Sequence, residues 1–144
     1  MHPTTLDKNC ENQSEKDKPL VIVIDNDIDN LLFASYAIES FGMNCVFIDK
    51  SEECLKLVNS LLPDIILLDI VMPKVNGLEI TRIIKQNTNT SHIPIIAVTG
   101  LTRSKEKREI MAAGCDDYLI KPYLIEDLEA KVFSHLKQHS SSTQ

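Results

Sequence analysis

The sequence lacks the features of a membrane, secreted or zinc-binding protein. Its longest apolar runs hold about half a dozen residues, against the ~20 that a membrane-spanning helix needs. The first 19 residues contain no apolar signal segment, and the four cysteines form no CxxC pair and no zinc-like spacing. We therefore expect free thiols, a cytoplasmic location and no membrane partner.

Positive charge is also scarce. The 144 residues include 15 Lys and Arg against 21 Asp and Glu, which gives a net charge of −6. That balance argues against non-specific binding to nucleic acid, so no nucleic-acid partner is expected. Apolar residues make up 43% and charged residues 25% of the chain. This composition is typical of one globular domain and excludes a wholly disordered chain, a collagen-like repeat and a coiled coil.

Composition divides the chain into three segments. Residues 1–18 are charged and almost free of apolar side chains, so they predict a disordered N-terminal tail. Residues 140–144, Ser-Ser-Ser-Thr-Gln, predict a disordered C-terminal tail. The folded domain is expected over 19–139, where short apolar runs alternate with segments of helical period.

The order of these segments predicts an α/β fold. Apolar runs predict strands at 20–24, 45–48, 65–68, 93–98 and 118–120. The runs 20–24 and 65–68 do not alternate polar with apolar residues, as is typical of parallel strands covered on both faces. A helical pattern follows each run, and the expected inward faces include Leu61, Ile83 and Leu124. The result is a (βα)5 doubly wound parallel sheet with helices on both faces.

Polar residues follow four of the five predicted strands. They are Asp25-Asn26-Asp27 after the first strand, Asp69 after the third, Thr99-Gly100 after the fourth and Lys121-Pro122 after the fifth. Parallel strands bring these ends to one edge of the sheet, where ligands of such folds bind. If the first and third strands are neighbours, Asp25 and Asp69 can share one cation. For Asp27 we favour the ordinary role of a helix N-cap.

The residue types at this edge suit phosphoryl transfer. Mg²⁺ typically takes one or two carboxylates, several waters and phosphate oxygens. The metal and Lys121 would neutralise a transferring phosphoryl group, and an aspartate can accept that group as an acyl phosphate. One aspartate after a strand is usually a cap or turn residue, but four polar strand ends together favour a functional site.

Five segments carry a family resemblance. They are VIVIDND at 21–27, LLDIVMP at 67–73, GLE at 77–79, PIIAVTG at 94–100 and AGCDDYLIKP at 113–122. In this order and spacing they resemble the response-regulator receiver domain of two-component signalling. The resemblance implies a flavodoxin-like sheet with strand order 2-1-3-4-5. It also implies a stand-alone phosphoacceptor rather than an enzyme, which receives its phosphoryl group from a sensor histidine kinase or a histidine phosphotransfer protein.

By the same resemblance, Asp69 is the phosphoacceptor and lies in a Mg²⁺ site. Asp25 matches the first residue of the family's acidic pair, and Val71 would offer its backbone carbonyl to the metal. The second acidic position is Asn26 here, which can ligate through its amide oxygen but brings no charge. We therefore expect weaker Mg²⁺ binding than is usual for the family, with Asp27 as a less favoured substitute ligand.

The remaining site residues are also assigned by resemblance. Thr99 matches the hydroxyl that binds the phosphoryl oxygen, Lys121 matches the lysine that pairs with the acceptor, and Gly100 leaves the pocket open to a donor. Tyr118 matches the switch aromatic, whose ring moves as Thr99 moves. The bond before Pro122 is expected to be cis.

Output and lifetime can be interpreted in the same way. The expected protein-interaction face combines the predicted fourth helix, to which 103–109 belong, with the fifth strand and the last helix. The ordinary interpretation of 103–109 is a solvated helix face. Its target is unknown. Val71 and Leu101 hold positions that help or hinder the hydrolytic water in the family, and both are apolar here. We therefore expect slow self-dephosphorylation.

Two other functions remain possible at this point. An atypical receiver that acts as a phosphorylation-independent interaction module would explain Asn26. An aspartyl-phosphate hydrolase of small substrates would share the acidic edge, but such enzymes need a second aspartate where this sequence has Val71. His135 and His139 are expected at a solvated helix end rather than in a metal site.

Overall fold

The computed structural model describes residues 17–72, 76–100 and 103–142. Most of the predicted N-terminal tail, and also Leu101, lie outside the described residues. Within the described ranges, five strands and five α-helices alternate along the chain. This alternation confirms the predicted α/β fold class.

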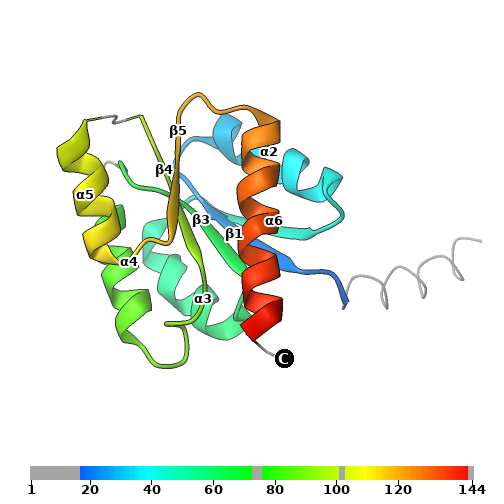
Figure 1. Cartoon of the computed structure of the whole chain (residues 1–144), viewed down its shortest axis with the longest axis horizontal. Helices are drawn as coiled ribbons and strands as arrows, with labels where there is room; N and C mark the ends of the chain where they lie inside the picture. Colours follow the sequence, from blue (N-terminus) through cyan, green and yellow to red (C-terminus); the bar gives the residue numbers. More distant parts are fainter. Residues whose placement is uncertain (1–16, 73–75, 101–102, 143–144) are drawn as a thin grey trace, which may run out of the picture.

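Five parallel strands form the centre of the molecule (Figure 1). They are β1 (Leu20–Ile24), β2 (Asn44–Ile48), β3 (Ile65–Asp69), β4 (Ile95–Thr99) and β5 (Asp117–Ile120). The strand order is β2-β1-β3-β4-β5, as the family resemblance implies. All five residues of β3 and of β4 are buried, which explains why their sequences are continuously apolar up to the last residue.

Helices cover both faces of the sheet (Figure 1). One face carries α2 (Ile28–Ser40) and α6 (Ile125–Ser142), and the other carries α3 (Cys54–Leu61), α4 (Gly77–Gln86) and α5 (Ser104–Ala113). A short 3-10 turn, η1 (Ser51–Glu53), precedes α3. The sheet therefore separates two apolar layers.

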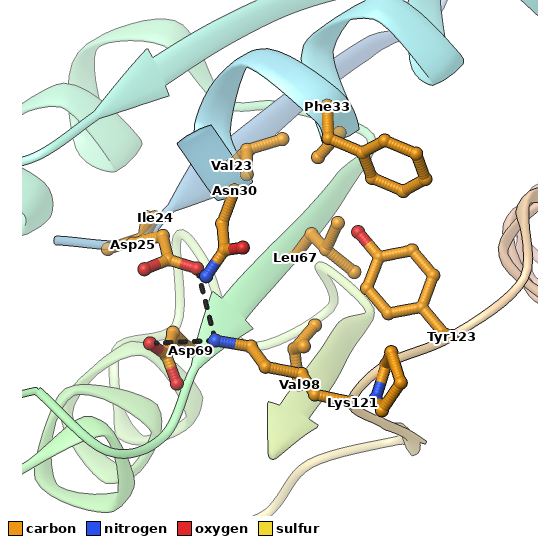
Figure 2. A pocket seen from close by; sticks show the side chains of 12 residues that line it. Val23, Ile24, Asp25, Asn30, Phe33, Leu67, Asp69, Val98, Lys121 and Tyr123 are labelled. Atoms are coloured by element: carbon orange, nitrogen blue, oxygen red, sulfur yellow. Dashed lines mark hydrogen bonds and ion pairs between the residues drawn. The ribbon is translucent and has the colours of Figure 1, made fainter. Parts of the chain in front are cut away.

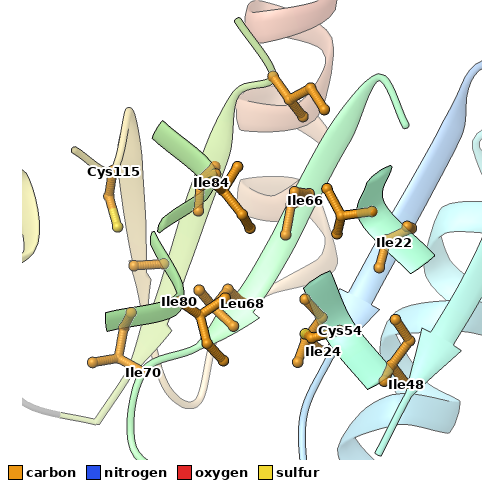
Figure 3. Packing of buried hydrophobic residues seen from close by; sticks show 14 of the residues in the cluster. Ile22, Ile24, Ile48, Cys54, Ile66, Leu68, Ile70, Ile80, Ile84 and Cys115 are labelled. Atoms are coloured by element: carbon orange, nitrogen blue, oxygen red, sulfur yellow. The ribbon is translucent and has the colours of Figure 1, made fainter. Parts of the chain in front are cut away.

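Successive residues of each strand enter opposite layers. In β1, Val21 and Val23 pack with α2 and α6, whereas Ile22 and Ile24 pack with the helices of the other face. Figure 3 shows the second layer, in which Ile80 of α4 lies over the strands. Because side chains alternate along a strand, one apolar run can fill both layers.

Helix ends follow the expected residue chemistry. Asp27 caps α2, where its carboxylate accepts a hydrogen bond from the Asp29 amide at 2.9 Å. Asn76 caps α4 in the same way. Gly42 and Gly114 follow α2 and α5 with φ angles of 84° and 112°, a conformation that favours glycine.

Three predicted core residues are instead exposed. The exposed fractions are 40% for Leu61, 42% for Ile83 and 66% for Leu124. Leu61 is the last residue of α3, and Leu124 precedes α6 as the residue whose carbonyl accepts the first helical hydrogen bonds. Apolar spacing alone assigned these positions to the core, but Leu61 and Leu124 lie at helix ends, outside the buried face. Ile83 lies within α4, where Ile80 and Ile84 form the buried face.

The last helix is longer than predicted. It continues through Ser142, whereas the sequence predicts disorder from residue 140. No proline or glycine interrupts this segment, so nothing in its chemistry ends the helix at His139. No helix among the described residues has both the length and the apolar character needed to cross a membrane.

Candidate functional site

The register of the sheet brings the predicted polar residues together. Strands β1 and β3 pair with Ile24 opposite Leu68. Asp25 and Asp69, the next residues on each strand, therefore emerge side by side at the carboxyl edge. Lys121, which follows β5, reaches both of them across β4.

Two buried carboxylates share one ammonium group at this edge (Figure 2). Lys121 Nζ donates to Asp69 Oδ2 at 3.2 Å and to Asp25 Oδ2 at 3.4 Å. Both aspartates are 5% exposed. The other carboxylate oxygens accept backbone hydrogen bonds, from Asp27 N to Asp25 at 3.0 Å and from Val71 N to Asp69 at 3.1 Å. These bonds fix the orientation of both carboxylates.

The site holds more negative than positive charge. Burial raises the pKa of Asp69, and the nearby charge of Asp25 raises it further. Lys121 and the Val71 amide lower the same pKa but do not cancel the rise. The ionised Asp69 is thus less stable than it would be in water, so an added cation would be favoured here.

The other predicted phosphoryl-binding residues lie at the same edge. Thr99 ends β4 and is 1% exposed, and its carbonyl accepts the Lys121 backbone N–H at 2.8 Å. Gly100 is exposed, and a β-carbon added there would meet no atom within 4 Å. The space beside Gly100 is therefore open among the described residues. The Lys121–Pro122 peptide bond is cis.

Tyr118 lies on β5 among basic side chains. Its half-buried ring has Lys107 Nζ at 5.6 Å and Lys131 Nζ at 5.9 Å from the ring centroid. The neighbouring Asp117 carboxylate pairs with Lys131 at 2.8 Å and with His135 at 3.1 Å. The prediction of a solvated His135 is wrong: its side chain is 11% exposed, because α6 packs this face of the helix against β5.

Two predicted metal ligands lie outside the buried cluster. Asn26 is exposed, and Val71 is 59% exposed. Among the described residues, no group of three or more His, Cys, Asp or Glu side chains is arranged to hold a metal ion. The charged ligands available at the edge are thus Asp25 and Asp69.

A pocket of about 410 Å³ opens from the carboxylate pair towards α2 (Figure 2). Asn30, Phe33 and Tyr123 line it, and the sequence predicts no role for any of these three residues. Asn30 shares this lining with Asp25, whereas Asn26 does not. For this side of the pocket, the sequence offers one indication, which is that Tyr123 directly follows the Lys121-Pro122 pair.

Gly77 allows α4 to begin close to the end of β3. A β-carbon at this position would lie 2.7 Å from the Ile70 α-carbon and 2.9 Å from the Asp69 carbonyl oxygen. The Gly77 amide donates to the Ile70 carbonyl at 3.1 Å. Glycine is therefore required here by close backbone approach, directly behind Asp69.

A family model described as the response regulator receiver domain matches residues 21–133. The chain belongs to this family. Receiver domains are regulatory modules of two-component signal transduction, and the matched residues include the whole acidic edge, from Asp25 to Lys121.

Individual relatives agree with this assignment. The polar-differentiation response regulator DivK of Brucella anthropi is 34% identical over 119 residues, which are 83% of this chain and 96% of that protein. The Francisella response regulator 1452 receiver domain is 29% identical, with a TM-score of 0.79 over 85% of this chain and 99% of that one.

A third structure shares the fold and holds a metal. It is the receiver domain of a Pseudomonas aeruginosa PAO1 sensor histidine kinase, with a magnesium ion coordinated in its active-site cleft. Its TM-score is 0.77 at 22% identity, over 83% of this chain and 98% of that one. At this identity the likeness shows the fold alone.

Proposed function

We propose that this receiver domain is a phosphoacceptor switch in which Asp69 takes a phosphoryl group from a protein phosphohistidine. The observation that carries the proposal is the pair of buried carboxylates that share the Lys121 ammonium. In the transfer, an Asp69 oxygen bonds to phosphorus while the bond from phosphorus to the donor imidazole nitrogen breaks. The products are an acyl phosphate on Asp69 and a histidine on the donor.

The residues of this edge fit Mg²⁺. Asp25, Asp69 and the Val71 carbonyl supply oxygen ligands, and one or two carboxylates are the number that Mg²⁺ sites typically use. When bound, the ion would neutralise charge on the phosphoryl oxygens. Exposed Asn26 would add an uncharged amide oxygen, so we expect weaker binding than with a third carboxylate. The Pseudomonas receiver domain, which shares this fold, holds a magnesium ion in its active-site cleft.

Three further residues would hold the transferred group. Lys121 already lies within 3.4 Å of both carboxylates, so its ammonium is placed to bind a phosphoryl oxygen on Asp69. Thr99, at the end of the next strand, would donate its hydroxyl to a second oxygen. Gly100 leaves the approach to Thr99 open. These residues bind and orient the phosphoryl group and assist only the protein's own modification.

The donor protein is expected to dock on α2. Ile28, Leu32 and Tyr36 are spaced four residues apart on this helix and are 53%, 53% and 73% exposed. The helix begins next to Asp25, so a helical sensor kinase or phosphotransfer domain seated on this apolar stripe would bring its phosphohistidine to the acidic edge. Such an encounter would occur in the cytoplasm, where free thiols such as Cys54 stay reduced.

The output face is expected over α5, β5 and α6. Tyr118 lies at its centre, between Lys107 and Lys131. Movement of Thr99 towards a phosphoryl group would change the space beside Tyr118 and so bias this face between two states. A protein target would bind one of the two states more tightly.

A second function is favoured by one observation, the exposed amide at Asn26. A receiver without a strong metal site would act as an interaction module whose contacts do not depend on phosphorylation. Burial of Asp69 and Thr99 beside Lys121 supports the switch instead, because an interaction module has no need of a strained carboxylate pair.

Intact-protein mass spectrometry distinguishes the phosphoacceptor switch from the interaction module. The full chain is incubated with Mg²⁺ and a small phosphodonor such as acetyl phosphate, beside Asp69→Asn and an EDTA control. One added phosphoryl group in the wild type alone is the expected result. No added mass together with no Mg²⁺ binding would support the interaction module, whereas Mg²⁺ binding without added mass would point to a strict requirement for the cognate kinase.

A further inference from the structure

The pocket beside the carboxylate pair is larger and more apolar than phosphoryl transfer requires. Its floor is formed by Val23, Leu67 and Val98, one residue from each of three adjacent strands. Its volume of about 410 Å³ lies within the ~300–1,000 Å³ of small-molecule sites. A phosphoryl group and a Mg²⁺ ion would occupy only the polar end and leave the apolar part unused.

An aromatic pair forms the outer rim of this pocket (Figure 2). The ring centroids of Phe33 and Tyr123 are 5.8 Å apart, and the ring planes are tilted by 57°. Phe33 comes from α2 and Tyr123 from the connection between β5 and α6, so the rim joins two separate elements. Ala34, also on α2, is a small residue that leaves room behind the rim.

The polar end of the pocket selects the charge of a ligand. Asp25 and Asp69 carry two negative charges against the one positive charge of Lys121. An anionic ligand would add repulsion from both carboxylates, whereas a cationic group would relieve their mutual repulsion. The Asn30 amide lines the same end and offers a further polar contact.

We propose that this pocket binds a small organic cation with a flat apolar body, such as an aromatic amine or amidine. The body would lie over Val23, Leu67 and Val98 and contact the rings of Phe33 and Tyr123. The cationic head would donate hydrogen bonds to Asp25 and Asp69. Such a ligand would occupy the position expected for Mg²⁺, so it would inhibit phosphorylation. That last consequence alone rests on the proposed function.

Amide chemical shifts of the ¹⁵N-labelled full chain in EDTA test the binding. The probe is phenethylamine, with 2-phenylethanol as the neutral control, phenylacetate as the anionic control and ethylamine as the cation without a ring. We expect saturable shifts at Ala34, Val98 and Tyr123, with a dissociation constant at least tenfold lower for phenethylamine than for any control. Equal affinity for the alcohol, or for ethylamine, would overturn the proposal.

Variants locate the site. Phe33→Ala removes an exposed ring of the rim and should weaken phenethylamine binding at least fivefold, whereas Phe133→Ala, which removes a similarly exposed ring paired with Phe41, should not change it. Ala34→Leu should fill the pocket and abolish binding, and its folding is checked by the spectrum of the free protein. Unchanged affinity in Phe33→Ala, or in a folded Ala34→Leu, would overturn the proposal.

Binding measurements with Mg²⁺ distinguish a failure of this proposal from a failure of the proposed function. If both proposals hold, phenethylamine binds in EDTA, and Mg²⁺ added in excess of EDTA displaces phenethylamine competitively. Phenethylamine binding with no Mg²⁺ binding would support the pocket and count against the phosphoacceptor. Mg²⁺ binding with no phenethylamine binding would overturn the pocket and leave the phosphoacceptor in place.

Discussion

Carboxylates at the amino edge of the sheet, where the strands begin, are paired differently from those at the carboxyl edge, where the strands end. At the amino edge, Asp64 accepts the Leu20 amide at 2.8 Å. Asp116 accepts the Ile95 amide at 2.8 Å and pairs with Lys85 at the same distance. Each of these carboxylates joins neighbouring segments of the fold, and Asp116 has a cation of its own.

The carboxyl edge has a shortage of positive charge. Asp25 and Asp69 divide the single cation of Lys121, at the longer distances of 3.4 and 3.2 Å, although both carboxylates are buried. Stability alone would not select two buried carboxylates with one partner, because burial of an incompletely paired charge is costly. The comparison teaches that the carboxyl edge is arranged for a further cation and the amino edge for folding.

The largest expected effect is on the rate of phosphorylation, when the lysine of the carboxyl edge is removed and that of the amino edge serves as the control. Lys121→Ala should lower the rate of phosphorylation by small phosphodonors about 100-fold, because one charged donor to the phosphoryl group is lost. Lys85→Ala is the matched variant: it should leave that rate unchanged and lower only the melting temperature. Mass spectrometry at a series of times measures both rates, and equal rates in the two variants would remove the distinction between the edges.

The next effect concerns the lifetime of the acyl phosphate. Val71 is exposed beside Asp69 and cannot orient water, and the resemblance assigns Leu101 to the corresponding position after Thr99. Val71→Asn combined with Leu101→Glu should shorten the phosphoryl half-life about tenfold, because polar side chains can position the hydrolytic water. Decay of the added mass after removal of the donor gives the half-life, and no change would reject this explanation.

A smaller effect is expected from restoring the third carboxylate. Asn26→Asp should strengthen Mg²⁺ binding at least fivefold, since two unit charges about 4 Å apart interact by ~1 kcal/mol even in water and Mg²⁺ carries two. Asn89→Asp places the same change on an exposed residue after α4 and should have no effect. Calorimetric titration compares the two, and tighter binding in Asn89→Asp would show that net charge alone matters.

The smallest effect is a pH dependence of stability. The pKa of Asp69 is raised by burial and by Asp25, so its protonated form stabilises the fold below the unfolded pKa of ~3.9, and this contribution is lost as pH rises through the folded pKa. Without Mg²⁺, Asp69→Asn should therefore melt at a higher temperature than wild type near pH 7.

That advantage should disappear near pH 3.5. Asp116→Asn should instead lower the melting temperature near pH 7, because it weakens the contacts with Lys85 and Ile95. Calorimetric melting curves at the two pH values decide the matter. An Asp69→Asn variant that is less stable than wild type at neutral pH would contradict the charge shortage.

The sequence predicts the fold and the carboxyl-edge site, but not the pairing of the carboxylates at the amino edge. Continuous apolar strands and the polar residues at their ends predict a parallel sheet, and the family motifs supply its order and the positions of Asp69 and Lys121. The contacts of Asp64 and Asp116 at the amino edge were not predicted, although Asp116 lies within the segment 113–122 that carries the family resemblance. Their backbone partners depend on strand register, which periodicity does not specify.

The pocket was also beyond sequence analysis. Phe33 reads as one more apolar residue of a helix, and Tyr123 as the residue after a motif. Their contact joins segments far apart in the chain, and the space behind them depends on the small size of Ala34 and on the packing of α2. The prediction of a buried Leu124 failed for a related reason, since periodicity does not show where a helix begins.

A Mg²⁺ titration tests the central claim most directly. The melting temperature of the wild type is measured in EDTA and in 10 mM MgCl₂, beside Asp25→Asn. A ligand that binds only the folded state stabilises it, so the wild type should melt several degrees higher with Mg²⁺ and Asp25→Asn should respond much less. A wild type that melts at the same temperature in both buffers, or an equal response in the variant, would contradict a cation site at the carboxyl edge.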